Sequence, residues 1–290
     1  MINQFKTLVL LGVLTAILVG FGGAIAPKYV WVFGAIGVLM NLVSYFFSDK
    51  IILAIHRARE VTPQEEPRLH AMVAELAQRA GIPKPRVCVL NQDMPNAFAT
   101  GRNPKHGVVA VTQGIRRLLS ERELRGVLAH EIAHVRNRDI LITTVAAIIA
   151  SLISSIAGVI RWGFIFGGLS RSSDDDDSGS GIATLVLAIV APIAATIVQL
   201  AVSQSREYLA DEKGGQLCGD PGALADALER LERGNQLVPA TIVAGAPATA
   251  SLFIVNPLRG SGLLSLFSTH PSTEERVRRL RVQARGTGSL

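Results

Sequence analysis

The residues best suited to chemistry are His130, Glu131 and His134, which form the pattern His-Glu-x-x-His. Two histidines at positions i and i+4 lie one turn apart on the same face of a helix, so both imidazoles can bind one metal ion. Glu131 stands beside them, where its carboxylate can take a proton from a water that the metal activates. Zinc suits two imidazole nitrogens, one carboxylate and an open fourth position. The pattern therefore predicts a zinc site built for hydrolysis.

A third ligand has to come from another part of the chain. A metzincin would carry a histidine ten residues after His130, but that position is Ile140. A carboxylate from a second helix is the other zincin solution, and Glu207 and Asp211 share a helical face at i and i+4. We expect Glu207 to bind zinc and Asp211 to accept the distal N–H of a ligand imidazole. Each could instead be an exposed helical carboxylate, and Glu212 points elsewhere.

The helix that carries the motif is predicted to run from about Glu121 toward Asp139. Ser120 and Glu123 have the S-x-x-E spacing of a capping box, and apolar residues continue from it at helical spacing. A second helix is predicted over residues 67–80, with Gly81 as its stop. Short strands are expected at Arg86–Leu90, Asn96–Gly101 and Gly107–Thr112. These strands should form a small sheet beside the two helices.

Four uncharged runs are long enough to cross about 30 Å of hydrocarbon as helices. They are Leu8–Ala26, Val30–Ser48, Ile140–Ile160 and Ile182–Val202. A cleaved signal peptide is the alternative for the first run, and a buried helical hairpin for the last two. The expected fold is therefore an α-helical integral membrane protein with a cytoplasmic zincin-like α+β catalytic domain. Its parts are two spans (1–48), a region with the sheet and motif helix (49–139), a transmembrane hairpin (140–202) and a helical region with the third ligand (203–290).

The charge distribution indicates topology rather than a nucleic-acid partner. The chain has 290 residues, 49% of them hydrophobic, and 29 basic against 23 acidic residues give a net charge of +6. Most lysines and arginines lie within 49–139 and 203–290, so the positive-inside rule places both segments and both termini in the cytoplasm. The composition excludes a disordered or fibrous protein. Two cysteines, Cys88 and Cys218, fit a reducing compartment better than a disulfide scaffold.

Four motifs occur in an order that resembles a known family. They are His130–His134, Ser205–Asp211, Asn96–Gly101, and Ser268–Ser272 with Arg276. The chain is similar in these motifs to the HtpX-type heat-shock metalloproteases, which are gluzincins related to the CAAX prenyl endopeptidases. The resemblance implies a zinc-dependent, multi-pass protease of the bacterial inner membrane that cuts misfolded or damaged membrane proteins on the cytoplasmic side. It also implies Glu207 as a ligand.

The same resemblance gives roles to residues that spacing alone does not assign. It implies that Asn96, Ala97, Phe98 and Ala99 form an edge strand along which an extended substrate can pair. Phe98 could instead belong to the core. His270 could donate to the oxyanion formed during hydrolysis, or cap the helix that follows it. Arg276 could bind a substrate carboxylate, or be a structural arginine of the last helix.

Two other functions are compatible with a zinc motif in a membrane protein, and each requires a sequence feature that can be checked. A site-two-type intramembrane protease would carry its zinc motif inside an apolar span, but Arg125, Arg136 and Arg138 flank this motif. A membrane scaffold with a structural zinc would need a fourth protein ligand, and neither cysteine has the paired spacing to supply it. The expected partners are membrane-protein substrates and the lipid bilayer, with no nucleic acid. The sequence leaves open whether the chain forms a homo-oligomer.

Overall fold

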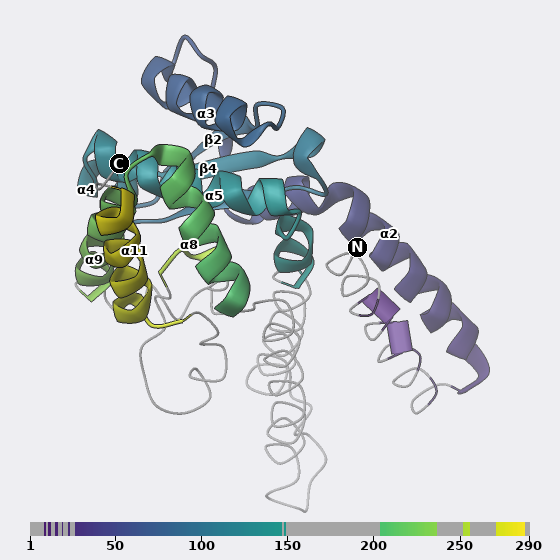
Figure 1. Cartoon of the computed structure of the whole chain (residues 1–290). Coiled ribbons are helices and arrows are strands. Elements are labelled where there is room, and N and C mark those ends of the chain that lie inside the picture. Colours follow the sequence, from purple (N-terminus) through teal and green to yellow (C-terminus); the bar gives the residue numbers. More distant parts are fainter. Residues whose placement is uncertain are drawn as a thin grey trace, which may run out of the picture.

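The structure is a computed structural model that describes residues 27–146, 204–236, 252–255 and 271–287, together with residues 9, 11, 12, 15, 16, 19, 23 and 148. Within these residues the chain is mostly helical and contains one small sheet (Figure 1). The expected first span is described only at isolated positions, and the third only at 140–146 and 148. The expected fourth span lies outside the described residues.

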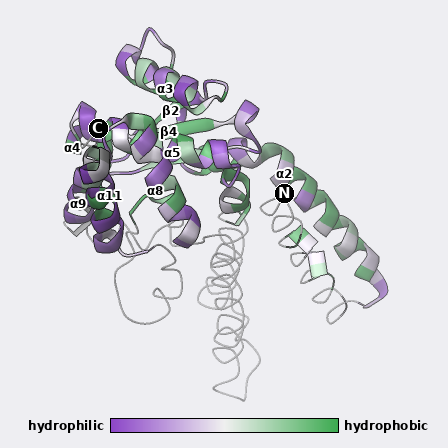
Figure 2. Cartoon of the chain, in the orientation of Figure 1, coloured by the Kyte–Doolittle hydropathy of each residue, from purple (hydrophilic) through white to green (hydrophobic). Residues whose placement is uncertain are grey.

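A long apolar helix begins the continuously described part of the chain. Helix α2, Val30–Ile55, follows the 3-10 turn η1, Pro27–Tyr29. The stretch Pro27–Ile55 has a mean hydropathy of 1.9 in its most apolar window, and only 11% of that window is buried. Figure 2 shows most of α2 in the green of hydrophobic residues. Among the described residues it is the one helix long and apolar enough to cross a membrane, and it contains the predicted run Val30–Ser48.

Four strands form a mixed sheet in the order β1-β2-β4-β3. Strands β2 and β4 pair in parallel, while β1 and β3 flank them in antiparallel pairs. The bounds are Arg59–Glu60 for β1, Arg86–Leu90 for β2, Ala97–Thr100 for β3 and Val108–Thr112 for β4. The three predicted strands are thus confirmed to within a residue at each end, and β1 is an addition.

The sheet is buried on both faces, because alternate residues of its inner strands enter two different cores. Val87 and Val109 face the core that helices build on one side. Leu90 and Ala110 face the opposite side, where Ile52 at the end of α2 and Phe98 of β3 complete a second cluster. The end of the apolar helix is therefore packed directly on the sheet.

Helix α5, Glu121–Asn137, is the element on which the motif lies. The hydroxyl of Ser120 accepts from the backbone N–H of Glu123, and the Glu123 carboxylate accepts from the backbone N–H of Ser120. The predicted capping box is thus confirmed. The helix ends at Arg138, a left-handed residue with φ 58°. Helix α3, Pro67–Ala80, also matches its prediction and ends at the left-handed Gly81.

Three further helices complete this side of the domain. Helix α8 covers Gln204–Cys218, α9 covers Pro221–Gln236 and α11 covers Thr273–Thr287. Helices α8 and α9 contact α5, and α11 contacts α8 and α9. The short helix α4, Gln113–Leu118, follows β4 directly. Figure 1 shows α8, in green, lying beside α5, in teal, with α9 and α11 to the left of α8. Among the helices that the structure describes, α5 and α8 make the most extensive contact, and this contact brings the candidate site together.

Candidate metal centre

The two motif histidines point their Nε2 atoms toward each other from one face of α5. His130 and His134 have Nε2 atoms 3.1 Å apart and ring centroids 4.6 Å apart. His130 is only 1% exposed, so its imidazole is removed from water. The helical spacing expected from the sequence therefore produces a pair of nitrogen donors with a common target.

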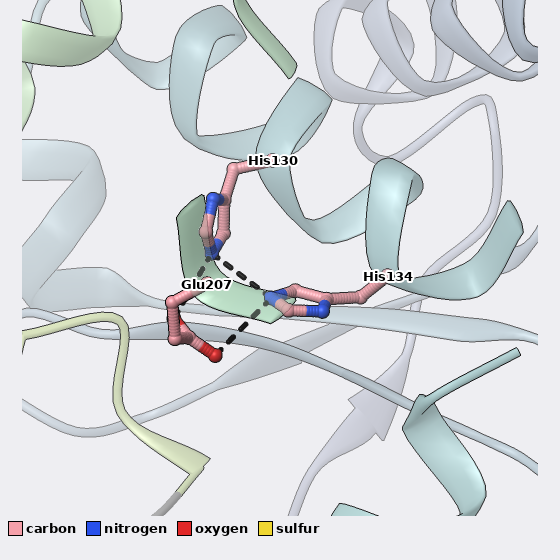
Figure 3. Close-up of side chains that lie close together, drawn as sticks. All are labelled: His130, His134 and Glu207. Atoms are coloured by element: carbon pink, nitrogen blue, oxygen red, sulfur yellow. Dashed lines mark hydrogen bonds and ion pairs between the residues drawn. The ribbon is translucent and has the colours of Figure 1, made fainter. Parts of the chain in front are cut away.

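Glu207 of α8 completes a triangle of donors. Its carboxylate oxygens lie 3.7 Å from His130 Nε2 and 3.6 Å from His134 Nε2. Figure 3 shows the three side chains converging, with the histidines on α5 and the glutamate on the neighbouring α8 ribbon. In the described residues these are the three side chains whose donor atoms all lie within 4.8 Å of one another.

A glycine allows α8 to lie this close to the motif. A Cβ atom at Gly214 would stand 2.9 Å from both the backbone N and the Cα of His130. Such contacts are shorter than atoms tolerate, and backbone atoms cannot turn aside as a flexible side chain does. The absence of a side chain at Gly214 therefore sets the separation between the helix with the histidines and the helix with Glu207.

Each motif histidine has a carboxylate at its other ring nitrogen. Asp211 Oδ1 lies 2.9 Å from His130 Nδ1, close enough to accept the distal N–H. Asp139 Oδ2 lies 3.0 Å from His134 Nδ1. Although burial opposes the charged form, Asp139 and Glu207 raise the pKa of His134 to about 10 in the absence of metal. These carboxylates favour imidazoles that present Nε2 to the centre.

Arg276 reaches the centre from α11 and holds Asp211. It is 1% exposed, and its guanidinium donates two hydrogen bonds of 2.8 Å to the two oxygens of Asp211. It donates a third, of 2.6 Å, to the carbonyl of Ile254. Although burial would raise the pKa of Asp211, Arg276 and His130 lower it, so the carboxylate stays charged. The structure thus connects Arg276 to His130 through Asp211.

Glu131 lies beside the donors and next to the edge strand. The residue is 5% exposed, and burial raises the pKa of its carboxyl to about 8, with the nearby His134 acting in the opposite direction. Its carboxylate also has a hydrogen bond with the backbone of Ala99 in β3. A cation at the centre would favour the charged form of this carboxylate. The geometry suits a group that takes a proton close to a bound substrate.

Strand β3 is an edge of the sheet that faces this glutamate. The backbone N–H of Thr112 donates to the carbonyl of Asn96, so the antiparallel alternation directs the backbone groups of Ala97 and Ala99 away from β4. Asn96 also accepts from the backbone N–H of Ile254 through its side chain. The side chain of Phe98 lies in the core beneath the strand.

The other residue expected at the site, His270, lies outside the described residues.

The donor set fits a divalent metal ion. Three donors that each lie about 2.1 Å from a tetrahedral ion are about 3.4 Å apart, and the observed spacings run from 3.1 to 3.7 Å. Two imidazole nitrogens and one carboxylate leave a position for water or substrate, unlike a structural site closed by four protein ligands. The buried triangle therefore has the spacing and the chemistry of a catalytic metal site.

The family model for Peptidase family M48 matches residues 63–284, a range that holds every donor described above. The chain belongs to this family. It is 52% identical to a protease HtpX homologue of Persephonella marina, over 99% of this chain and 100% of the relative. It is 48% identical to a protease HtpX homologue of Thermococcus kodakarensis, over 99% and 98% of the two chains.

A solved structure has a similar fold. The crystal structure of S. mikatae Ste24p matches with a TM-score of 0.50 and 18% identity, over 96% of this chain and 65% of that one. The family and the relatives establish a metallopeptidase, and they agree with the apolar helix α2 in indicating a membrane protein. The predicted class of enzyme is thereby confirmed.

The structure brings four of the residues singled out from the sequence together. His130, His134 and Glu207 converge, and Asp211 lies against His130. Asp139 was not expected to contact His134. No spacing in the sequence indicates this contact, because it depends on one left-handed residue, Arg138, which turns the chain back toward the histidine after the end of α5.

Proposed function

We propose that this protein is a zinc-dependent endopeptidase of the bacterial inner membrane. Its substrates would be misfolded or damaged membrane proteins, cut on the cytoplasmic face. The observation that carries this proposal is the convergence of His130, His134 and Glu207 beside the buried carboxylate of Glu131. A metal-dependent hydrolase needs both an open metal site and a base next to it, and a structural metal site needs neither.

We propose zinc as the metal because two imidazoles and one carboxylate form a borderline-soft donor set that suits this ion. When bound, zinc supplies the Lewis acidity that activates water and polarises the scissile carbonyl. Glu131 takes the proton from the attacking water and returns it to the leaving amine. His270 is proposed as a donor to the oxyanion. Asp211 and Asp139 keep the two imidazoles in one tautomer and orientation.

We propose that the substrate lies along β3 as an additional strand. The outward-directed backbone groups of Ala97 and the carbonyl of Ala99 are the hydrogen-bonding groups that such pairing would use, since the N–H of Ala99 donates to Glu131. A peptide paired there would lie beside Glu131, which already contacts the backbone of Ala99. In this proposal Asn96 and Phe98 hold β3 in place, Asn96 through its hydrogen bond with Ile254 and Phe98 by packing in the core. Arg276 orients Asp211 and does not touch the substrate.

We propose four spans with both termini in the cytoplasm, which places the metal centre on that side of the membrane. The positive charge of 49–139 and 203–290 supports this orientation. Helix α2 supports the second span directly by its length and exposed apolar surface. The remaining runs, around 8–26, 140–160 and 182–202, support the other three by length and lack of charge.

The proposal is tested by Glu131→Gln in the full-length protein. The amide keeps the shape of the side chain but cannot take a proton, so hydrolysis of a model membrane protein should fall by at least about 100-fold. Bound zinc should stay at the wild-type level because the three ligands remain. Glu121→Gln, at an exposed carboxylate of the same helix, is the matched control and should behave as wild type. Wild-type hydrolysis by Glu131→Gln would exclude the proposed mechanism.

A further inference from the structure

A pocket of about 510 Å³ lies where the apolar helix α2 approaches the sheet domain, and nothing in the proteolytic chemistry uses it. We call it the kink pocket, and its lining residues are Phe46, Phe47, Asp49, Lys50, Arg102 and His106. At Phe47 the backbone of α2 leaves helical geometry, with φ −117° and ψ 15°. The pocket therefore combines one end of an apolar helix with a loop of the catalytic domain.

Two cations line this pocket and lie over aromatic rings. The ammonium of Lys50 stands 5.4 Å from the ring centroid of Phe47, and the guanidinium of Arg102 stands 5.7 Å from that of Phe46. Both distances are within the range of cation–π contacts. Arg102 also donates to the backbone carbonyl of Phe46, at 3.4 Å. The helix and the loop are thus joined through their cationic and aromatic side chains.

Arg102 is held in position by the short loop that follows β3. Its Nη2 lies 2.9 Å from His106 Nε2, and His106 Nδ1 lies 2.9 Å from Asn103 Oδ1. The loop closes tightly at Gly101, which has φ 130° and where a Cβ atom would stand 2.3 Å from the carbonyl oxygen of His106. Only glycine fits that position. The guanidinium is therefore fixed before any ligand arrives.

The charge of the kink pocket is positive. Its one carboxylate, Asp49, is bound by the guanidinium of Arg86. Lys50 makes no hydrogen bond or ion pair with any part of the chain that the structure describes, and the two described bonds of Arg102 use two of its five N–H donors. Among the described residues that line it, the pocket thus offers ammonium and guanidinium donors, and its one carboxylate is already paired with Arg86. An anion with several oxygens is the complementary ligand.

The surroundings of the pocket favour an anion that carries an apolar tail. Along α2 the approach to the pocket is apolar and exposed, with Leu39 60% and Leu42 51% exposed. Next to Lys50 and Arg102, the aromatic residues Tyr45, Phe46 and Phe47 are 38%, 49% and 46% exposed. Aromatic rings followed by lysine and arginine are the arrangement found at the headgroup level of a membrane. An amphiphilic anion can therefore place its acyl chains along α2 and its phosphate between the cations.

We propose that the kink pocket binds the phosphate group of an anionic phospholipid, with Arg102 and Lys50 as its donors and Phe46 and Phe47 against the upper part of its acyl chains. The bound lipid would join the membrane helix to the loop directly after β3. The site is independent of the metal centre and of whether the proposed peptidase chemistry is correct.

The test is native mass spectrometry of the detergent-solubilised full-length protein, titrated with dioctanoyl phosphatidylglycerol, with dioctanoyl phosphatidylcholine and with inorganic phosphate. Phosphatidylglycerol should bind most tightly. Each basic residue near a charged lipid contributes about a fivefold change in affinity. Lys50→Gln and Arg102→Gln should therefore each lower the affinity for phosphatidylglycerol about fivefold, and the double variant should lower it about 25-fold. Should the double variant not fold, the two single variants decide the question.

Arg68→Gln with Arg278→Gln is the matched control, since both arginines are exposed and lie on α3 and α11. This control has the same change in net charge and should keep phosphatidylglycerol affinity within about twofold. The proposal is overturned if the kink-pocket variants bind phosphatidylglycerol as wild type does, or if the control loses as much affinity. Inorganic phosphate binding as tightly as phosphatidylglycerol would identify a free-phosphate site and overturn the lipid assignment.

Discussion

At the residue scale, each histidine of the candidate metal centre contacts a different carboxylate, and the two carboxylates have different partners. Asp211 receives two hydrogen bonds from the buried Arg276. Asp139 contacts His134, and its second oxygen, Oδ1, is buried without a hydrogen-bond partner among the described residues. Removing either carboxylate should weaken metal binding, but only the loss of Asp211 leaves a buried arginine without its ion-pair partner.

This difference predicts the behaviour of Asp139→Asn and Asp211→Asn. Both should lower zinc affinity by about 10- to 100-fold, because each releases one ligand imidazole from its orienting partner. Asp211→Asn should in addition lower the free energy of unfolding by about 3 kcal/mol, since it breaks a buried ion pair. Zinc titration and denaturant unfolding of the metal-free proteins measure the two effects. Equal free energies of unfolding in the two variants would contradict this account of Arg276.

The residues of the site could be predicted from the sequence only where regular spacing relates them. His130 with His134, and Glu207 with Asp211, are pairs at i and i+4, so helical periodicity places each pair on one face. Asp139 lies beyond the end of α5, and its return toward His134 depends on a left-handed backbone at Arg138 that no periodic pattern reveals. Position along the chain does not determine such a reversal.

At the element scale, the separation of α5 and α8 decides whether the donors can share an ion. Gly214 lies against the backbone of His130, and Gly126 of α5 lies against the backbone of Leu224 in α9. Backbone-to-backbone contacts of this kind bring the helices closer than side chains would allow. The amphipathic patterns of α5 and α3 gave their bounds, but the partners of each helix follow from such close contacts, which the sequence does not display.

Gly214→Ala should therefore damage the site although alanine favours helices. The new Cβ atom would meet His130 backbone atoms at 2.9 Å, so the helices must move apart, at a cost of about 1–3 kcal/mol in unfolding free energy. Zinc affinity should fall with it, because the distance from Glu207 to the histidines increases. Chemical unfolding and zinc titration measure both effects.

Gly286→Ala is the control for this substitution. Gly286 lies in α11, and no atom stands within 4 Å of where its Cβ would be. Its replacement should leave zinc binding unchanged and stabilise the fold by up to about 1 kcal/mol through helix propensity. If Gly214→Ala behaved in the same way, close helix packing would not be what positions Glu207.

At the scale of the whole molecule, the apolar helix α2 packs directly on the sheet of the domain that holds the candidate metal centre. Ile52 of α2 is completely buried among Leu90, Phe98 and Ala110 on the face of the sheet opposite the helical core. The helix that hydropathy predicts as a membrane span therefore ends inside the domain that carries the candidate metal centre. Periodicity predicted the strands and the span, but not that Ile52 would join them.

Topology is tested with reporters fused along the chain. The four-span arrangement predicts that a reporter at residue 28 or at residue 175 is periplasmic, and that one fused after Leu290 is cytoplasmic. Residues 175 and 290 lie outside the described part of the chain, so the prediction rests on the charge and length of the uncharged runs. Paired alkaline phosphatase and fluorescent-protein fusions measure it. A cytoplasmic residue 175 would mean that the last two runs do not cross the membrane.

The account depends most on the assignment of the third metal ligand, and bound zinc per protein measures it directly. In Glu207→Ala only the two histidines remain, so zinc content and hydrolysis should fall together. Glu212→Ala is the matched control, since Glu212 is an exposed carboxylate of the same helix, and it should keep both at wild-type levels. A Glu207→Ala protein that retains one zinc per chain would contradict the assignment.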